Sequence, residues 1–506
     1  MSKFYLTTPI YYINDLPHIG HAYTTFVADT VARYRRIKGD DVLFATGTDE
    51  NSQKNVEAAN KAGETDLRKY LDKMSARWQE TWDELNISND DFIRTTESRH
   101  YETVLVFFDL VNKRGDIYKG VYEGLFCDGC EAFLTEKDLV DGKCSYHLKE
   151  PRKISEENYF FRLSNYAKPL LEHIEKNPNF IRPEKRRNEI VNYIKAGLND
   201  ISISRQSLKC GLLFPLDKNQ KIYVWFDALI NYLTAAGFGH DEEKFKKWWP
   251  ADLHLMGKDI TRFHAVIWPA MLMSAKLQLP KTIFAHGFFT INGEKMSKSF
   301  GNTIDPVELS KIYPLDAIRY FLLREIKFGE DGDFSLVYLK EHYNNDLANV
   351  FGNLLYRALS MTEQYFGGRV PKHSEKSEGL DPLCEIDVWR EFEDKMDNYK
   401  FNEALDVIWK VIEAANKFIE NEKPWQLAKI NENRLKDVLY NLLETLRQVG
   451  WLLLPLMPDT SERVWKQIGI DTAEEKGKKI ELAKIWGGLK SGIAVKKGEP
   501  IFPRII

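Results

Sequence analysis

The chain has 506 residues, 43% hydrophobic and 13% aromatic, so it is too long for a single core and is expected to form two to four domains. Its formal net charge is −4, with 71 basic and 75 acidic residues spread along the sequence, which excludes a polybasic or polyacidic tail as the means of binding a partner. The sequence contains no signal-peptide pattern and no run of about 18 apolar residues, and it contains only five cysteines. We therefore expect a cytoplasmic protein that does not enter a membrane.

The first fifty residues predict a strand, a helix and a second strand. The strand covers residues 3–13, the helix residues 20–38 ("GHAYTTFVADTVARYRRIK"), and the second strand residues 42–46. A βαβ unit of this length implies a parallel sheet, and such sheets bind ligands outside the carboxyl ends of their strands. The "PHIGH" turn lies at one of these ends and Asp49 lies at another.

The "PHIGH" turn places two histidines and a glycine at the start of the first helix. A helix N-terminus attracts phosphate, Gly20 permits close approach to the backbone, and the imidazoles of His18 and His21 can donate hydrogen bonds to phosphate oxygens. The alternative is that His18 only caps the helix and His21 only packs. A second motif, "KMSKS" at residues 295–299, carries two lysines suited to a leaving pyrophosphate. Together the two motifs indicate a site for a nucleoside triphosphate.

A cluster of cysteines interrupts the alternation of strands and helices. Cys127 and Cys130 have Cys-x-x-Cys spacing, and Cys144 and His147 follow in Cys-x-x-His spacing. These four ligands suit one tetrahedral zinc ion, which should be structural because no coordination position stays open. Beyond about residue 345 apolar residues recur at steps of three and four, which predicts a helical bundle.

The "PHIGH" and "KMSKS" motifs, with the sequence around them along nearly the whole chain, resemble the methionyl-tRNA synthetases, a family of class I aminoacyl-tRNA synthetases. The resemblance implies an α/β fold, with a Rossmann-type parallel-sheet catalytic domain split by a zinc-binding insertion and followed by an all-α anticodon-binding helical bundle. The expected divisions are residues 1–115 and 216–290 for the catalytic domain, 116–215 for the insertion, 291–345 for the KMSKS loop and stem-contact region, and 346–506 for the bundle.

The resemblance also implies an activity. L-methionine and ATP with Mg²⁺ would form methionyl adenylate and pyrophosphate, and methionine would then pass to the 3′ end of tRNA(Met), including the initiator tRNA. Zinc would be bound once per chain. The absence of a further domain after the core of the family implies a monomer.

Site residues carry over from the family where the motifs match. The catalytic residues would be His18, His21, Lys295 and Lys298. The ATP site would comprise Gly20, Gly257, Asp259, Lys298 and, less directly, Arg205. The methionine pocket would comprise Ile10, Tyr12, Asp49, Trp225, Ala228, Leu229, Tyr232 and His286, with Asp49 receiving the ammonium group. The zinc ligands would be Cys127, Cys130, Cys144 and His147, and the anticodon contacts Asn353, Arg357 and Trp425.

One position departs from the family pattern: after "GTDE" the family usually carries histidine, and this chain has Asn51. Two alternative functions remain open at this stage. One is another class I synthetase, for leucine, isoleucine, valine or cysteine, although the insertion is short for the large branched-chain enzymes. The other is a zinc-containing RNA-binding protein without catalysis, which would leave both nucleotide motifs unexplained.

Overall fold

The computed structural model describes residues 2–129, 131–134, 139–145, 148–206, 208, 210–295, 302–372 and 388–505. The chain forms two compact units. One, here called the sheet unit, comprises Lys3–Pro17 and Val42–His286. The other, here called the bundle unit, comprises Met1–Ser2, His18–Asp41 and Gly287–Ile506. Among the helices of the described residues, none has both the length and the apolar character needed to cross a membrane.

A parallel β-sheet organises the sheet unit. Within the described residues its six strands follow the order β3 (Asp91–Arg94), β2 (Asp41–Asp49), β1 (Lys3–Tyr12), β14 (Leu253–Gly257), β15 (Ile283–His286) and β9 (Ile181–Arg182). The pairs β2 with β3, β1 with β14, β14 with β15 and β15 with β9 all run parallel. The parallel sheet expected from the first βαβ unit is therefore confirmed.

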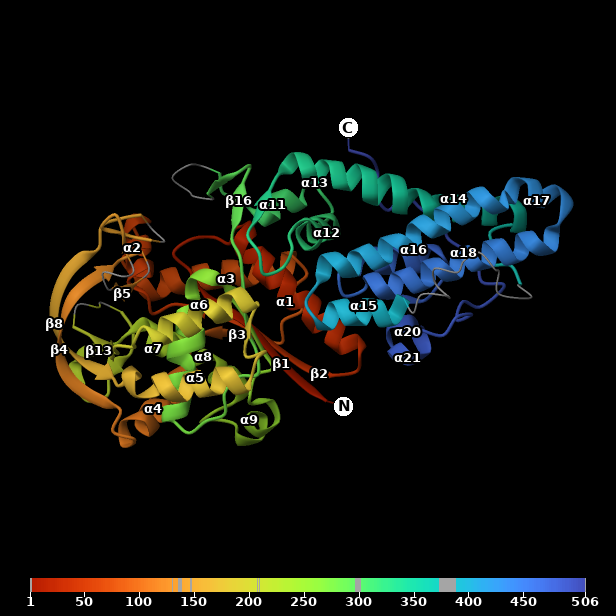
Figure 1. The fold of residues 1–506 in the computed structure, drawn as a ribbon. Helices are drawn as coiled ribbons and strands as arrows, with labels where there is room; N and C mark the ends of the chain where they lie inside the picture. Colours follow the sequence, from red (N-terminus) through yellow and green to blue (C-terminus); the bar gives the residue numbers. More distant parts are fainter. Residues whose placement is uncertain are drawn as a thin grey trace. The chain divides into compact units, whose positions relative to one another are not determined.

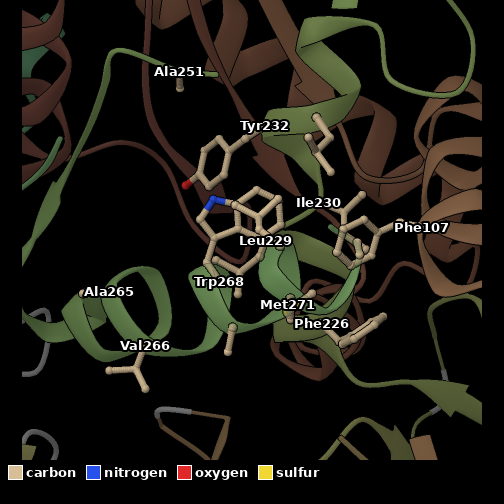
Figure 2. Close-up of a cluster of buried hydrophobic side chains, with 14 of the residues drawn as sticks. Phe107, Phe226, Leu229, Ile230, Tyr232, Ala251, Ala265, Val266, Trp268 and Met271 are labelled. Atoms are coloured by element: carbon tan, nitrogen blue, oxygen red, sulfur yellow. The ribbon is translucent and has the colours of Figure 1, made fainter. Parts of the chain in front are cut away.

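Helices and a large apolar cluster accompany this sheet. The helices are α2 (Gln53–Lys61), α3 (Leu67–Glu84), α4 (Ser98–Lys113), α5 (Ala167–Lys176), α6 (Glu184–Lys195), α7 (Val224–Ala228), α8 (Asn231–Ala236), α9 (Glu242–Trp248) and α10 (Trp268–Ser274), with a π-helical turn at Phe263–Ile267. Figure 2 shows part of the core, where Tyr232 lies beside Trp268, with ring centroids 6.0 Å apart, and Leu229 and Met271 lie in the same cluster.

Most strands of the predicted insertion form antiparallel sheets inside the sheet unit, whereas β9 of the same stretch belongs to the main parallel sheet. The long strands β4 (Ile117–Cys127) and β8 (Arg152–Phe161) pair along their length and curve together, as Figure 1 shows. Shorter strands accompany them: β5 (Ala132–Leu134), β6 (Leu139–Val140), β7 (Lys143–Cys144), β10 (Ile201–Ser202), β11 (Ser204–Arg205), β12 (Leu213–Phe214) and β13 (Asp217–Ile222). Zinc binding by this insertion stays a prediction.

The bundle unit is mainly helical. Its helices are α1 (Ile19–Ile37), α11 (Pro306–Ser310), α12 (Leu315–Glu325), α13 (Leu336–His342), α14 (Asn353–Phe366), α15 (Val388–Asp397), α16 (Phe401–Glu422), α17 (Pro424–Ile430), α18 (Glu432–Leu453), α19 (Pro458–Gln467), α20 (Thr472–Lys476) and α21 (Ile480–Ala483), with a π-helical stretch at Tyr343–Gly352. A small sheet contains β16 (Phe289–Ile291), β17 (Glu294–Lys295) and β18 (Gly332–Phe334). The apolar stripes of α16 and α18 are buried, which confirms the predicted helical C-terminal part.

Helix α1 is fixed within the bundle unit by a buried ion pair. Arg319 on α12 and Asp29 on α1 are both fully buried, and Nη1 of Arg319 lies 2.7 Å from Oδ2 of Asp29. Nε of Arg319 also donates to the carbonyl of Leu456, at 3.0 Å. Further along α1, Lys38 Nζ lies 3.0 Å from Asp397 Oδ2 on α15. The helix ends where Gly39 takes a φ of +85°, which favours glycine.

Candidate active site

The two histidines of the "PHIGH" turn cap α1 reciprocally. The backbone N–H of Gly20 donates to Nδ1 of His18 at 3.1 Å, and the backbone N–H of His18 donates to Nδ1 of His21 at 3.2 Å. The rings stack with centroids 3.7 Å apart. Because Nδ1 accepts in each ring, the neutral tautomer carries its proton on Nε2 and can donate it to a phosphate oxygen. The structure therefore confirms that His18 caps α1, and both capping bonds use Nδ1 rather than Nε2.

Electrostatics keep both rings in that neutral form. Burial lowers the pKa of His18, and burial together with the neighbouring His18 ring lowers the pKa of His21. The backbone N–H of Ile19 donates to the carbonyl of Ile304 at 2.9 Å, so the chain just after the second motif lies against the N-terminus of α1. The backbone of Lys295 ends strand β17. Met296 to Ser299, including Lys298, and the side chain of Lys295 lie outside the described residues.

Two adjacent carboxylates at the end of β2 have opposite surroundings. Glu50 is fully buried and accepts from Arg94, with Nε at 2.6 Å and Nη2 at 3.0 Å. Asp49 is 3% exposed, and its carboxylate accepts a 3.3 Å hydrogen bond from the backbone N–H of Asn51. In the described part of the chain no lysine, arginine or histidine pairs with Asp49. Among the described residues, this carboxylate therefore has no cation that would neutralise it.

Other buried acids surround Asp49. Burial, followed by the neighbouring carboxylates of Asp227 and Glu131, raises the pKa of Asp49 well above its usual range. Asp227 accepts from the side-chain amide of Asn51 at 2.6 Å and contacts Nε2 of His100 at 3.0 Å. The carboxylate of Glu131 accepts from Ser52 Oγ at 2.6 Å and from the backbone N–H of Gln53 at 2.8 Å. A bound cation would be stabilised by this environment.

An aromatic wall lies in the same unit. Trp225 stacks on Phe263, with ring centroids 3.8 Å apart and an interplanar angle of 11°. The hydroxyl of Tyr232 and Nε2 of His264 are 2.7 Å apart, and His264 lies edge-on to Trp225. All four residues come from α7, α8 and the π-helical turn after β14. The arrangement can enclose an apolar side chain and present one polar pair to it.

The remaining methionine-pocket predictions fall into three groups. Ile10 and Tyr12 lie half-buried at the carboxyl end of β1. Ala228 and Leu229 are buried, and Leu229 lies in the apolar cluster of Figure 2. His286 is buried at the end of β15 and pairs in register with Gly257, a residue predicted for the ATP site.

The predicted nucleotide residues end strand β14 and begin the turn after it. Gly257 is the last residue of β14, and Asp259 lies exposed in the short 3₁₀ turn Lys258–Ile260. Arg205 is buried on β11, where Nε donates to Glu156 Oε2 at 2.9 Å and the guanidinium lies 4.3 Å from the centroid of the Phe126 ring. The charge of Arg205 is therefore already balanced by a carboxylate.

Two of the four predicted zinc ligands are described. Cys127 at the end of β4 and Cys144 at the end of β7 are both buried, whereas Cys130 and His147 lie outside the described residues. The backbone turns after each cysteine: Glu131 N–H donates to the Asp128 carbonyl at 3.4 Å, and Leu148 N–H donates to the Cys144 carbonyl at 2.8 Å. Buried thiols at two turns with Cys-x-x-Cys and Cys-x-x-His spacing fit a tetrahedral zinc ion. Among described residues alone no group of three such ligands forms.

The predicted anticodon residues lie on two helices of the bundle unit. Asn353 is exposed at the start of α14, and Arg357 on the same helix pairs with Glu420 of α16 at 2.5 Å. Trp425 follows Pro424 at the start of α17 and is 42% exposed. The Trp425 ring is therefore accessible, as stacking on a base requires.

Five residues near the predicted sites carry no recognisable sequence motif: His100, Glu131, Asp227, Phe263 and His264. Asp227 and His264 stand inside stretches that the sequence does mark, "VWFDALINY" and "DITRFHAVIW", yet their partners are fixed only by the fold. His100 and Glu131 contact residues 127 and 79 positions away, so their roles emerge only from tertiary structure.

The chain is similar to known aminoacyl-tRNA synthetases along nearly its whole length. Residues 4–153 and 136–359 match the family model described as tRNA synthetases class I (M), and residues 387–492 match that of the anticodon-binding domain of tRNA ligase. The chain is 48% identical to methionine–tRNA ligases of Thermotoga maritima and Caldanaerobacter subterraneus subsp. tengcongensis. The alignments cover 99% of this chain and 80% and 79% of those proteins.

Solved structures agree. The methionyl-tRNA synthetase of Mycobacterium tuberculosis in complex with methionyl-adenylate superposes with a TM-score of 0.95 at 40% identity, covering all of both chains. The free-state structure of the same enzyme gives a TM-score of 0.87 at 37% identity, covering 100% of this chain and 99% of the other.

Proposed function

Because the chain belongs to the methionine–tRNA ligases, a family of class I aminoacyl-tRNA synthetases, we propose that the buried carboxylate of Asp49 receives the ammonium group of L-methionine. The enzyme activates methionine with ATP and Mg²⁺ and transfers it to tRNA. One observation carries the proposal. Asp49 is buried beside other acids with no cationic partner in the described chain, whereas the adjacent Glu50 is neutralised by Arg94.

The aromatic wall supplies the rest of the pocket in this proposal. Trp225 and Phe263 offer apolar faces to the thioether side chain, and the hydroxyl–imidazole pair of Tyr232 and His264 closes it. Ile10 and Tyr12 contribute from the end of β1. Ala228, Leu229 and His286 remain predictions for this pocket, with Leu229 supporting the wall from the core.

The phosphate end of ATP is assigned to the N-terminus of α1. In this proposal His18 and His21 donate from Nε2, and Gly20 leaves room at the backbone. The methionine carboxylate attacks the α-phosphorus, the bond to pyrophosphate breaks, and Lys295 and Lys298 balance the charge that the pyrophosphate carries away. Gly257 and Asp259 would hold the adenosine, with the exposed carboxylate of Asp259 accepting from ribose hydroxyls. A contact between Arg205 and the phosphates stays a prediction.

A structural zinc ion, one per chain, is assigned to Cys127, Cys130, Cys144 and His147. Bound there, zinc would cross-link the ends of β4 and β7. Glu131 directly follows one of these ligands and hydrogen-bonds to the start of α2, so the same loop also touches the surroundings of Asp49.

The tRNA is assigned to the bundle unit. Asn353, Arg357 and Trp425 would read the anticodon of tRNA(Met), initiator tRNA included, through edge hydrogen bonds and stacking. The monomeric state, the cytoplasmic location and the five-part division of the chain at residues 115, 215, 290 and 345 stay predictions.

Methionine-dependent exchange of pyrophosphate into ATP tests the central assignment. Asp49→Asn keeps the size of the side chain and removes its charge, so the KM for methionine should rise about tenfold or more, the scale of a charged hydrogen bond. The KM for ATP should change little, and Ser274→Ala, which removes a buried hydrogen bond to Asp116 elsewhere in the sheet unit, serves as control. An unchanged KM for methionine in a folded Asp49→Asn protein would refute the assignment.

A further inference from the structure

Asn51 occupies a point where three buried hydrogen bonds meet. Its side-chain amide donates to Asp227 Oδ2 at 2.6 Å and to the carbonyl of Thr95 at 3.2 Å, and its backbone N–H donates to Asp49 Oδ1 at 3.3 Å. The residue is 4% exposed. Asn51 therefore joins the carboxylate assigned to the substrate ammonium to a second, deeper carboxylate.

The deeper carboxylate is itself held from the other side. Oδ1 of Asp227 lies 3.0 Å from Nε2 of His100, and Nδ1 of His100 lies 2.9 Å from Oγ1 of Thr234. Asp227, His100 and Thr234 are each 1% exposed or less. A chain of hydrogen bonds runs from α8 through His100 and Asp227 to Asn51, and such a buried, satisfied network fixes the side chains within it.

Asp49 is held along its backbone as well. The side-chain amide of Asn55 donates to the carbonyl of Asp49 at 2.9 Å. Asn55 thus fixes the main chain of Asp49, and the backbone N–H of Asn51 is the contact that reaches its carboxylate. The direction of that carboxylate depends on where the Asn51 backbone is held.

We propose that Asn51 is a positioning residue for methionine recognition, because its amide, clamped by Asp227 and the Thr95 carbonyl, holds its backbone N–H against the Asp49 carboxylate that receives the substrate ammonium. The inference rests on the proposed role of Asp49. An amide suits this position because both of its N–H bonds lie on one nitrogen and reach two acceptors. It also carries no charge, so it adds no cation that would compete with the ammonium.

The proposal predicts that Asn51 affects recognition of the ammonium group of methionine but not of its thioether side chain. Methioninol keeps the ammonium and the thioether but lacks the carboxylate, and 4-(methylthio)butan-1-ol lacks the ammonium as well. The inhibition constants of both compounds in pyrophosphate exchange, measured for wild type and variants, report whether a change acts on the ammonium or on the whole pocket. A side chain with a purely structural role would alter both constants together.

Asn51→Leu removes both side-chain donors at nearly constant size. We expect methioninol to bind about tenfold more weakly or worse, and 4-(methylthio)butan-1-ol to change by less than about twofold. Asn51→His, whose imidazole N–H can donate to Asp227, should recover methioninol affinity to within about threefold of wild type. Asp227→Asn, which keeps the shape but removes the charge that the Asn51 amide contacts, should show the same selective loss and is the second variant if Asn51→Leu does not fold.

Each other result overturns the inference or its premise. If Asn51→Leu and Asp227→Asn weaken the binding of both compounds equally, Asn51 supports the pocket as a whole and not the ammonium site. If neither compound binds more weakly, Asn51 has no role in recognition. Asp49→Asn tests the premise separately: if this variant binds methioninol normally, the ammonium site itself is misassigned, whatever Asn51 does. Ser274→Ala controls for the loss of a buried hydrogen bond and should leave both constants unchanged.

Discussion

The hydroxyl of Tyr223 donates a 2.6 Å hydrogen bond to the main-chain carbonyl of Glu131. Tyr223 precedes the helix that carries Trp225, and Glu131 follows a predicted zinc ligand. Through its carboxylate Glu131 also accepts from Ser52 and from the backbone of Gln53 at the start of α2. Glu131, in the predicted zinc-binding loop, is thus hydrogen-bonded both to Tyr223, just before α7, and to the start of α2, which follows Asp49.

Glu131→Ala should consequently affect methionine binding although Glu131 is not assigned to the substrate. Loss of the carboxylate leaves the Ser52 hydroxyl and the Gln53 N–H buried without their acceptor, at a cost of about 1 to 3 kcal/mol. We expect a lower melting temperature and a KM for methionine raised about three- to tenfold, measured by pyrophosphate exchange. Glu123→Ala, an exposed glutamate on β4, is the matched control. A variant that behaved like this control would show that the loop and the pocket are independent.

The predicted zinc ion can be tested by metal content. Wild-type protein should contain about one zinc per chain, and Cys144→Ser should lose it together with several degrees of thermal stability. Cys210→Ser removes a buried cysteine that lies outside the Cys-x-x-Cys pattern and should keep the metal. Freshly purified wild-type protein without zinc would contradict the prediction, and so would equal metal loss in both variants.

Tyr232→Phe should weaken methionine recognition by removing the hydroxyl that faces His264. Burial lowers the pKa of His264 to about 4, so the ring stays neutral near pH 7 and needs its partner. We expect the KM for methionine to rise about three- to thirtyfold, with that for ATP nearly constant. Tyr5→Phe also breaks a buried hydroxyl hydrogen bond, to the carbonyl of Tyr232, and should lower stability without this selective effect. Equal KM changes in both variants would place the Tyr232 hydroxyl in the general core.

Trp425→Ala separates amino-acid activation from tRNA recognition. Stacking of a base on an aromatic ring contributes about 1 to 3 kcal/mol, so aminoacylation of tRNA should fall about ten- to a hundredfold. Methionine-dependent pyrophosphate exchange without tRNA should hardly change. Ile430→Ala removes another exposed apolar side chain from α17 and should leave both reactions intact. If aminoacylation survives in Trp425→Ala, the anticodon is read elsewhere, and the assignments of Asn353 and Arg357 lose their support.

Asp316 should make the stability of the bundle unit fall with rising pH. Burial, and then the carboxylate of Asp459, raise the pKa of Asp316 from 3.8 to about 6, and its Oδ2 accepts from the backbone N–H of Thr460. The folded state therefore holds more protons than the unfolded chain between pH 3.8 and 6. This contribution to stability is present below that window and is lost as pH rises through 6, by about 3 kcal/mol in all.

Asp316→Asn removes the titration. Relative to wild type, the variant should gain about 3 kcal/mol of stability between pH 3 and pH 8, with about half of the gain reached near pH 5. Unfolding by urea at several pH values measures this difference. Glu413→Gln, an exposed position on α16, should show no such gain. A difference between wild type and Asp316→Asn that does not vary with pH would contradict the raised pKa.

The elements that could be predicted from the sequence are those whose signals are local. The strand expected at 3–13 spans Lys3–Tyr12, and the helix expected at 20–38 spans Ile19–Ile37, because apolar periodicity, a capping residue and a glycine stop all lie within a few positions. The second strand runs to Asp49 rather than Thr46, since the polar residues at its end still continue the pairing with β3.

The contacts that complete the candidate site are non-local and left no pattern to recognise. Asn51 and Asp227 are 176 positions apart, and the pairing of β4 with β8 joins residues on either side of the predicted zinc loop. Family resemblance selects Asp49, Trp225 and Tyr232, but not the residues that hold them. The residues that hydrogen-bond to these three side chains or pack against them can be identified only from the folded structure.

The ion pair of Asp29 and Arg319 sets a limit on how this enzyme can be shortened. A protein cut before α12 would lose Arg319, and the Asp29 carboxylate, on the helix that begins with the "PHIGH" turn, would keep Arg33, whose Nε lies 2.7 Å from Asp29 Oδ2, as a guanidinium partner. The loss would fall on the contacts by which Arg319 ties α1 to the rest of the bundle unit, to Asp29 and to the carbonyl of Leu456. An engineer seeking a minimal activating fragment would have to supply another anchor for α1 in place of Arg319, and could leave the pair of Asp29 and Arg33 unchanged.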